Sequence, residues 1–139
     1  MLSKKDQKII SVLKEDSRKS IRDIAKLTKL RPSTVHLRLQ KLKKENIIEK
    51  FTVKLDNKAV DENFIVFLFV TTEDNLSKTF LNSPNIKEVF GITGEYDLLL
   101  KLKFKDIEEF NKFLIDLRKN KNIRKTLTMV STVNVKEEM

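Results

Sequence analysis

The chain contains no cysteine and only one histidine, so the side chains that usually hold transition metals are almost missing from it. Disulfide bonds and thiolate metal sites are excluded, and no metal or other cofactor is expected. The longest apolar run, Phe64 to Val70, is far shorter than the roughly 20 residues that span a bilayer, and no signal peptide precedes it. These absences predict a soluble cytoplasmic protein without a membrane partner.

Glycine and proline are also scarce, with two of each among 139 residues, which argues against low-complexity linkers. Forty per cent of the residues are hydrophobic, enough to build a packed core. Charge is divided unevenly, because residues 1–50 hold 15 Lys and Arg against 6 acidic residues, whereas residues 51–139 hold 14 of each. This division predicts two domains with different functions.

Aromatic residues are absent from residues 1–50, although that segment carries the whole net charge of +9. A positive surface attracts nucleic acid, although an excess of lysine also keeps proteins soluble. Proteins that bind single strands stack bases on exposed aromatic rings, and this half of the chain has none. The composition therefore favours double-stranded DNA as the partner.

Three short helices are expected in the basic segment. Ser3 and Ser20 each precede an aspartate by three positions, which is the pattern of a helix N-cap. Pro32 predicts the start of a third helix over residues 32–45. Three helices with a short turn before the last are typical of a helix-turn-helix domain.

The third helix has one apolar face and one polar, cationic face. Val35, Leu39 and Leu42 recur at helical spacing and should be buried. The opposite face would lie in a major groove, where Arg, Gln, Ser and His reach base edges and Lys reaches phosphates. The alternative is the solvated face of an ordinary three-helix bundle. The candidate DNA-binding residues are Arg31, Ser33, Thr34, His36, Leu37, Arg38, Gln40, Lys41 and Lys44.

The hydrophobic period changes after this helix. Asn46 is expected to end it in a left-handed conformation, and residues 51–63 are expected to form a linker strand. From residue 64 the expected order is β-α-β-β-α-β, with a short helix over 74–83 and a final strand over 123–135. This order is typical of a ferredoxin-like fold with both helices on one face of an antiparallel sheet.

The expected fold class is therefore α+β. A helix-turn-helix (winged-helix-like) domain is assigned to residues 1–50 and a ferredoxin-like effector-binding and oligomerisation domain to residues 64–139. The strand from Phe64 to Val70 is apolar on both faces, which one subunit cannot bury. A second subunit is expected to cover it, which gives a homodimer or a higher homo-oligomer.

Three segments give the chain a resemblance to the Lrp/AsnC (feast/famine) family of transcriptional regulators. They are DQKIISVLKEDSRKS, IAKLTKLRPSTVHLRLQKLKKENII and ITGEYDLLLKL, and in this order they span most of the sequence. The resemblance implies a regulator that binds double-stranded DNA and responds to a small-molecule effector such as an amino acid. Because two subunits should present two recognition helices, the preferred DNA site is expected to be roughly palindromic. Lys29 and Asn46 depart from the family, which usually has glycine at both places.

The third segment resembles the Thr-Gly-x-x-Asp turn that helps to form the effector pocket of the family between subunits. By this resemblance Gly94 lets the backbone approach a ligand, exposed amides meet the ligand's carboxylate, and Asp97 meets its ammonium group. Alternatively, Gly94 only permits a tight turn. The candidate effector-binding residues are Gly94, Glu95, Tyr96 and Asp97, with Thr128 and Thr132 supplied by a neighbouring subunit.

An enzyme is the main alternative, because siroheme decarboxylases resemble the family in architecture and act on tetrapyrroles. Such chemistry needs histidines or other polar groups in the pocket, and residues 51–139 contain no histidine and a single tyrosine. Nucleotide-binding and nucleophile motifs are missing as well. A purely structural or RNA-binding role fits the ring-free basic domain less well. No enzymatic activity is therefore expected.

Overall fold

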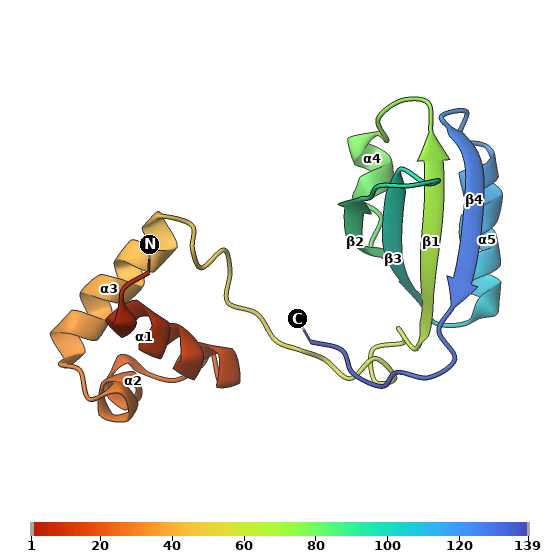
Figure 1. The fold of residues 1–139 in the computed structure, drawn as a ribbon. Helices are drawn as coiled ribbons and strands as arrows, with labels where there is room; N and C mark the ends of the chain where they lie inside the picture. The colour runs from red at the N-terminus through yellow and green to blue at the C-terminus, as the bar shows by residue number, and fades with distance from the viewer. Residues whose placement is uncertain (1, 139) are drawn as a thin grey trace. The chain divides into compact units, whose positions relative to one another are not determined.

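The computed structural model describes residues 2–138, which form two compact units divided between Lys54 and Leu55. Each unit has its own apolar core, so each is described by itself (Figure 1). No helix within residues 2–138 combines the length and the apolar character needed to cross a membrane.

The first unit consists of α1 (Lys4–Glu15), α2 (Ile21–Thr28) and α3 (Pro32–Lys44), which confirms the three expected helices. Ser3 begins α1 as predicted, because its hydroxyl accepts the Asp6 N–H at 3.1 Å and the Asp6 carboxylate accepts the Ser3 N–H at 3.2 Å. Apolar side chains from all three helices meet in one core, with Ile9, Ile24 and Val35 fully buried. This packing fixes which side of α3 is left outside.

Lys29 and Asn46, where the family usually has glycine, both hold a left-handed backbone. Asn46, which follows α3, has a φ of 57°, so the predicted helix stop is confirmed. Lys29 ends α2 with a φ of 59° and a ψ of 31°. A lysine Cβ is crowded in this conformation, whereas asparagine and glycine adopt it at little cost.

Replacing Lys29 with glycine should therefore stabilise the chain by about 0.5–1 kcal/mol, because the strain at this position disappears. The matched control is Lys26→Gly inside α2, which should lower the free energy of unfolding by about 1 kcal/mol. Urea denaturation of the two variants measures both changes. Equal losses in both variants would contradict the assignment of strain to Lys29.

The second unit contains β1 (Phe64–Thr72), α4 (Lys78–Leu81), β2 (Ile86–Gly91), β3 (Leu98–Phe104), α5 (Ile107–Arg118) and β4 (Ile123–Val130). The strands form one antiparallel sheet in the order β2-β3-β1-β4. Phe80 of α4 and Phe113 of α5 pack against the same buried strand residues, so both helices cover one face of the sheet (Figure 1). The expected ferredoxin-like arrangement is confirmed.

The other face of the sheet is called the open face here. It presents Phe67 and Phe69 of β1, because these alternate with the buried core residues of that strand. Their register partners share the face, and Phe90 and Met129 are 54% and 51% exposed. Other members are Ile65, Glu88, Leu99, Lys101, Lys103, Lys125 and Leu127. Helices cover none of this surface within residues 2–138 (Figure 1).

The structure differs from the sequence-based expectation in the segment between the units. Residues 51–63, expected to form a linker strand, are not part of any sheet. Residues 57–61 form a turn, and just before it the Asp56 carboxylate accepts the Ala59 N–H at 2.9 Å. A strand needs a hydrogen-bonded neighbour, and this segment has none within the described residues. The alternating hydrophobic pattern alone therefore predicted a strand that the segment does not form.

Two other elements are shorter than expected. The helix expected over 74–83 is α4, which begins only after Ser77, because that hydroxyl accepts the Phe80 N–H and caps the helix there. The strand expected over 123–135 ends at Val130, where its pairing with β1 stops at Val66. Ser131 makes the last contact, donating its N–H to the Ile65 carbonyl at 2.9 Å.

Candidate functional site

The outer face of α3 lies opposite the core of the first unit. Val35 is fully buried, Leu42 is 2% exposed and Leu39 packs partly buried against the same core, so the opposite side of the helix faces outward. Thr34 and Arg38 are partly buried at the edge of this face. The structure brings the nine predicted DNA-binding residues together on one helix and its N-cap, and the exposed ones are Arg31, Ser33, His36, Leu37, Gln40, Lys41 and Lys44.

Most polar side chains on this outer face are free to bind another molecule. Within residues 2–138 no hydrogen bond or ion pair engages the side chains of Ser33, His36 or Gln40. Among the described residues Lys41 pairs only with Glu45, one helical turn further on, at 4.0 Å and in an exposed position. Such a pair contributes little to stability, so Lys41 can exchange it for a phosphate.

Arg38 has a second role that the sequence did not indicate. Its Nη1 lies 3.8 Å from the Oδ2 of Asp6 on α1, and Asp6 is only 7% exposed. The Asp6 Oδ1 is buried and has no hydrogen-bond partner in the part of the chain that the structure describes. The guanidinium therefore balances a buried carboxylate, and no sequence signal links two residues so far apart in the chain.

The Gly94–Asp97 turn connects β2 to β3 and lies across the end of β1 (Figure 1). Gly94 has a φ of 108°, which strongly favours glycine. Asp97 anchors the turn, since its N–H donates to the Val70 carbonyl and its Oδ2 accepts the Thr72 N–H, both at 2.9 Å. Asp97 thus has a structural contact in addition to any contact with a ligand.

Glu95 and Tyr96 in this turn contact Lys125 of β4. Lys125 forms an ion pair with the Glu95 carboxylate, and its Nζ lies 5.2 Å from the centre of the Tyr96 ring. The hydrogen bond to Glu95 raises the pKa of Lys125. The Tyr96 ring also packs on Phe69, with 5.7 Å between ring centres. Lys125 therefore belongs to the turn region, although the sequence had not indicated it.

Thr128 and Thr132 lie away from this turn in the same subunit. Thr128 pairs with buried Leu68, so it lies on the helix side of the sheet, where it lines a cavity with Arg118 and Thr126. The turn contacts Lys125 and Phe69 on the open face. Thr132 follows the end of β4. Any joint contact of the threonines and the turn with one ligand requires a second subunit.

Comparisons with known proteins define the class to which the two units belong. Residues 2–49 match the model of a winged helix-turn-helix DNA-binding domain, and residues 65–139 match the Lrp/AsnC ligand binding domain. An uncharacterized HTH-type transcriptional regulator of Pyrococcus horikoshii is 34% identical over 147 aligned positions, which cover 100% of this chain and 98% of that protein. The chain is a DNA-binding transcriptional regulator with a small-molecule-binding domain. It belongs to the Lrp/AsnC family.

Solved structures share this fold over nearly the whole chain. LrpC of B. subtilis superposes with a TM-score of 0.87 at 25% sequence identity and covers 99% of each chain. A transcriptional regulator of Neisseria meningitidis, solved as a complex with L-Met, superposes with a TM-score of 0.90 at 24% identity, covering 99% of this chain and 94% of that one. The predicted fold and family are confirmed.

Proposed function

We propose that the chain reads specific sites in double-stranded DNA with the outer face of α3. The observation that carries this proposal is that Ser33, His36 and Gln40 are exposed and unpaired within residues 2–138, and cations lie on both sides of them. A face that only needed to stay soluble would not require a ring-free set of hydrogen-bonding side chains between the cations.

The side chains on this face have different roles in the proposed complex. Ser33, Thr34, His36 and Gln40 contact base edges, because their hydroxyl, imidazole and amide groups match the donors and acceptors of the major groove. Leu37 is 65% exposed and is suited to contact a thymine methyl group. Arg31, Lys41 and Lys44 neutralise phosphates, and Arg38 does so while it is held by Asp6.

The assembly that presents α3 to DNA is a homo-oligomer formed through the open face. Phe67 and Phe69 lie on this face with Leu127 and Met129, so self-association would bury a continuous apolar surface. Two copies related by a twofold axis present two recognition helices. The preferred site is therefore roughly palindromic, with half-sites one helical turn or a multiple of it apart. Such a regulator acts in the cytoplasm, where the DNA is.

A titration that compares duplex and single-stranded DNA of the same sequence tests this function. Fluorescence anisotropy should show tighter binding to the duplex. The logarithm of affinity should fall with the logarithm of salt concentration with a slope of about 0.9 for each phosphate contacted. Binding that ignores salt, or that favours the single strand, would rule out the proposed groove contact.

The effector of this chain is proposed to be an amino acid bound at the Gly94–Asp97 turn. The N. meningitidis structure contains L-Met, and this chain has the same fold. Within residues 2–138 the N–H groups of Gly94, Glu95 and Tyr96 donate no hydrogen bond, so they are free to meet a carboxylate. Asp97 is exposed and can place its second oxygen against an ammonium group.

The variant Asp97→Asn tests this assignment, because asparagine still accepts the Thr72 N–H but loses the negative charge. A saturating amino acid at about 100 times its Kd should stabilise the wild-type chain by about 2.7 kcal/mol, and the variant should lose this gain. Melting temperatures across the common amino acids measure it. Asp74→Asn serves as the control for an exposed carboxylate elsewhere. If no amino acid changes the melting temperature or DNA binding, the effector proposal falls.

No specific observation favours the alternative of a siroheme-decarboxylase-like enzyme, and we expect no catalytic activity. An absorbance spectrum of the purified protein distinguishes the two functions. A regulator of the proposed kind should show no tetrapyrrole band, and no band should appear when a tetrapyrrole is added. A bound tetrapyrrole would reopen the enzyme assignment.

A further inference from the structure

Two lysines lie on the open face, among residues that are mostly apolar. Lys101 and Lys103 of β3 alternate with the buried residues Leu100, Leu102 and Phe104, so both project onto the open face. Their side chains are only 15% and 12% exposed. A charge that is partly removed from water needs a partner, and two like charges on neighbouring positions need one even more.

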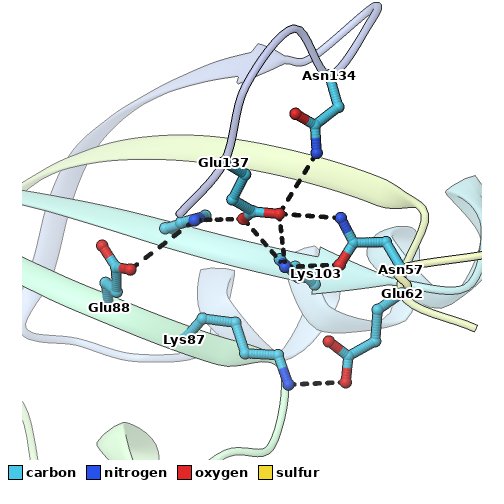
Figure 2. A network of polar contacts seen from close by, with 8 residues as sticks. Asn57, Glu62, Lys87, Glu88, Lys103, Asn134 and Glu137 are labelled. Atoms are coloured by element: carbon cyan, nitrogen blue, oxygen red, sulfur yellow. Dashed lines mark hydrogen bonds and ion pairs between the residues drawn. The ribbon is translucent and has the colours of Figure 1, made fainter. Parts of the chain in front are cut away.

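The partner comes from the tail that follows β4, residues 131–138. The Glu137 carboxylate forms ion pairs with Lys101 and, at 3.0 Å, with Lys103 (Figure 2). The Lys103 Nζ also donates to the Asn57 Oδ1 at 2.7 Å, and Asn57 in turn donates its Nδ2 to Glu137 at 3.0 Å. The Glu137 side chain therefore holds both the tail and the segment around Asn57 against the same end of the open face.

This network is electrically neutral. Glu88 of β2 lies 3.8 Å from the Lys101 Nζ, so Glu88 and Glu137 together balance the two lysines (Figure 2). Burial raises the pKa of Glu137, but hydrogen bonds from Lys101, Asn57 and Lys103 outweigh it and lower the pKa from 4.5 to about 2. Glu137 therefore stays charged at neutral pH, and the neutrality depends on the tail being in place.

The tail also extends the apolar surface. Glu137 holds it against the sheet while Val133 and Val135 remain 69% and 90% exposed. Two exposed valines next to a half-exposed sheet face are the kind of surface that a partner covers. No side chain within residues 2–138 buries them.

We propose that residues 131–138 form part of the interface between two copies of this chain, and that Glu137 makes this interface possible by neutralising Lys101 and Lys103. The proposal rests on the self-association through the open face described above. When two such faces meet, a lysine without a partner loses its remaining water on assembly, and this desolvation cost opposes the contact. With Glu137 in place each face enters the contact without net charge at this end, and the valines of the tail add apolar area.

The test uses the full chain and measures its mass across a range of concentrations by sedimentation equilibrium. Glu137→Lys should weaken self-association at least about tenfold, because three like charges then lie at the interface. Asp116→Lys is the matched control for the charge reversal, since Asp116 is exposed on α5, which covers the other side of the sheet. This control should assemble like the wild type. The double variant Lys103→Glu with Glu137→Lys restores opposite charges and should restore assembly.

Circular dichroism checks the folding of each variant. If Glu137→Lys fails to fold, Val135→Asp gives the same test without touching the network, because Val135 is almost fully exposed. It should also weaken assembly at least about tenfold. A wild-type chain that is monomeric at every concentration would contradict assembly itself. If the wild type is an oligomer and the Val135→Asp and Glu137→Lys variants assemble equally well, the proposed role of the tail is wrong, while assembly through the open face still stands.

Discussion

Phe67→Glu should convert the chain to a monomer and lower its affinity for duplex DNA about 100-fold or more. Phe67 lies on the open face between its register partners Lys101 and Met129, at the centre of the proposed interface. A carboxylate there would have to lose its water on assembly, which costs several kcal/mol without a new partner. DNA affinity falls as well, because the two copies of α3 are then no longer linked and each must bind its half-site separately.

The control for this substitution is Ile115→Glu on α5. Ile115 is 52% exposed on the opposite side of the sheet, so a charge there should leave both the mass and the DNA affinity unchanged. Light scattering measures the mass, and a melting curve shows whether each variant is folded. A folded Phe67→Glu protein with the mass of the wild type would contradict assembly through the open face.

Substitutions on the outer face of α3 should divide into two kinds. Ser33→Ala and Gln40→Ala should each cost about 1–3 kcal/mol of discrimination between the preferred site and other duplexes, because they remove contacts to base edges. Lys41→Ala and Lys44→Ala should weaken binding to all duplexes alike and should each reduce the salt slope by about 0.9. Titrations with preferred and scrambled duplexes over a salt series measure both effects.

Arg38 is unsuitable for this comparison, because its removal would leave the buried Asp6 carboxylate without a cation. A loss of DNA binding in Arg38→Ala could then reflect a less stable first unit. Equal losses on preferred and scrambled duplexes for Ser33→Ala and Gln40→Ala would assign these two residues to the DNA backbone instead.

The features that were predictable from the sequence depend on short-range rules. Ser3 and Ser20 marked helix starts because a capping hydroxyl and the amide N–H that donates to it lie three residues apart. Asn46 marked a helix end because asparagine tolerates a left-handed backbone. The buried and exposed sides of α3 followed from its helical periodicity alone.

The features that were missed depend on contacts between distant parts of the chain. The segment 51–63 alternates like a strand, but no neighbouring strand is there to pair with it. The Asp6–Arg38 pair, the Lys125–Glu95 pair and the fastening of Glu137 join residues whose proximity only the fold creates. No local sequence pattern indicates partners that are distant in the chain. From the sequence alone, Lys101 and Lys103 therefore resembled ordinary polar positions of a strand.

Selection of bound fragments from a random pool of duplex DNA tests the central proposal most directly. The full chain should enrich one roughly palindromic sequence, with half-sites one helical turn or a multiple of it apart. Ser33→Ala and Gln40→Ala together should broaden that sequence at the positions they contact, without changing the spacing of its half-sites. A pool that stays random after repeated selection, while the chain still binds DNA, would contradict sequence-specific reading by the outer face of α3.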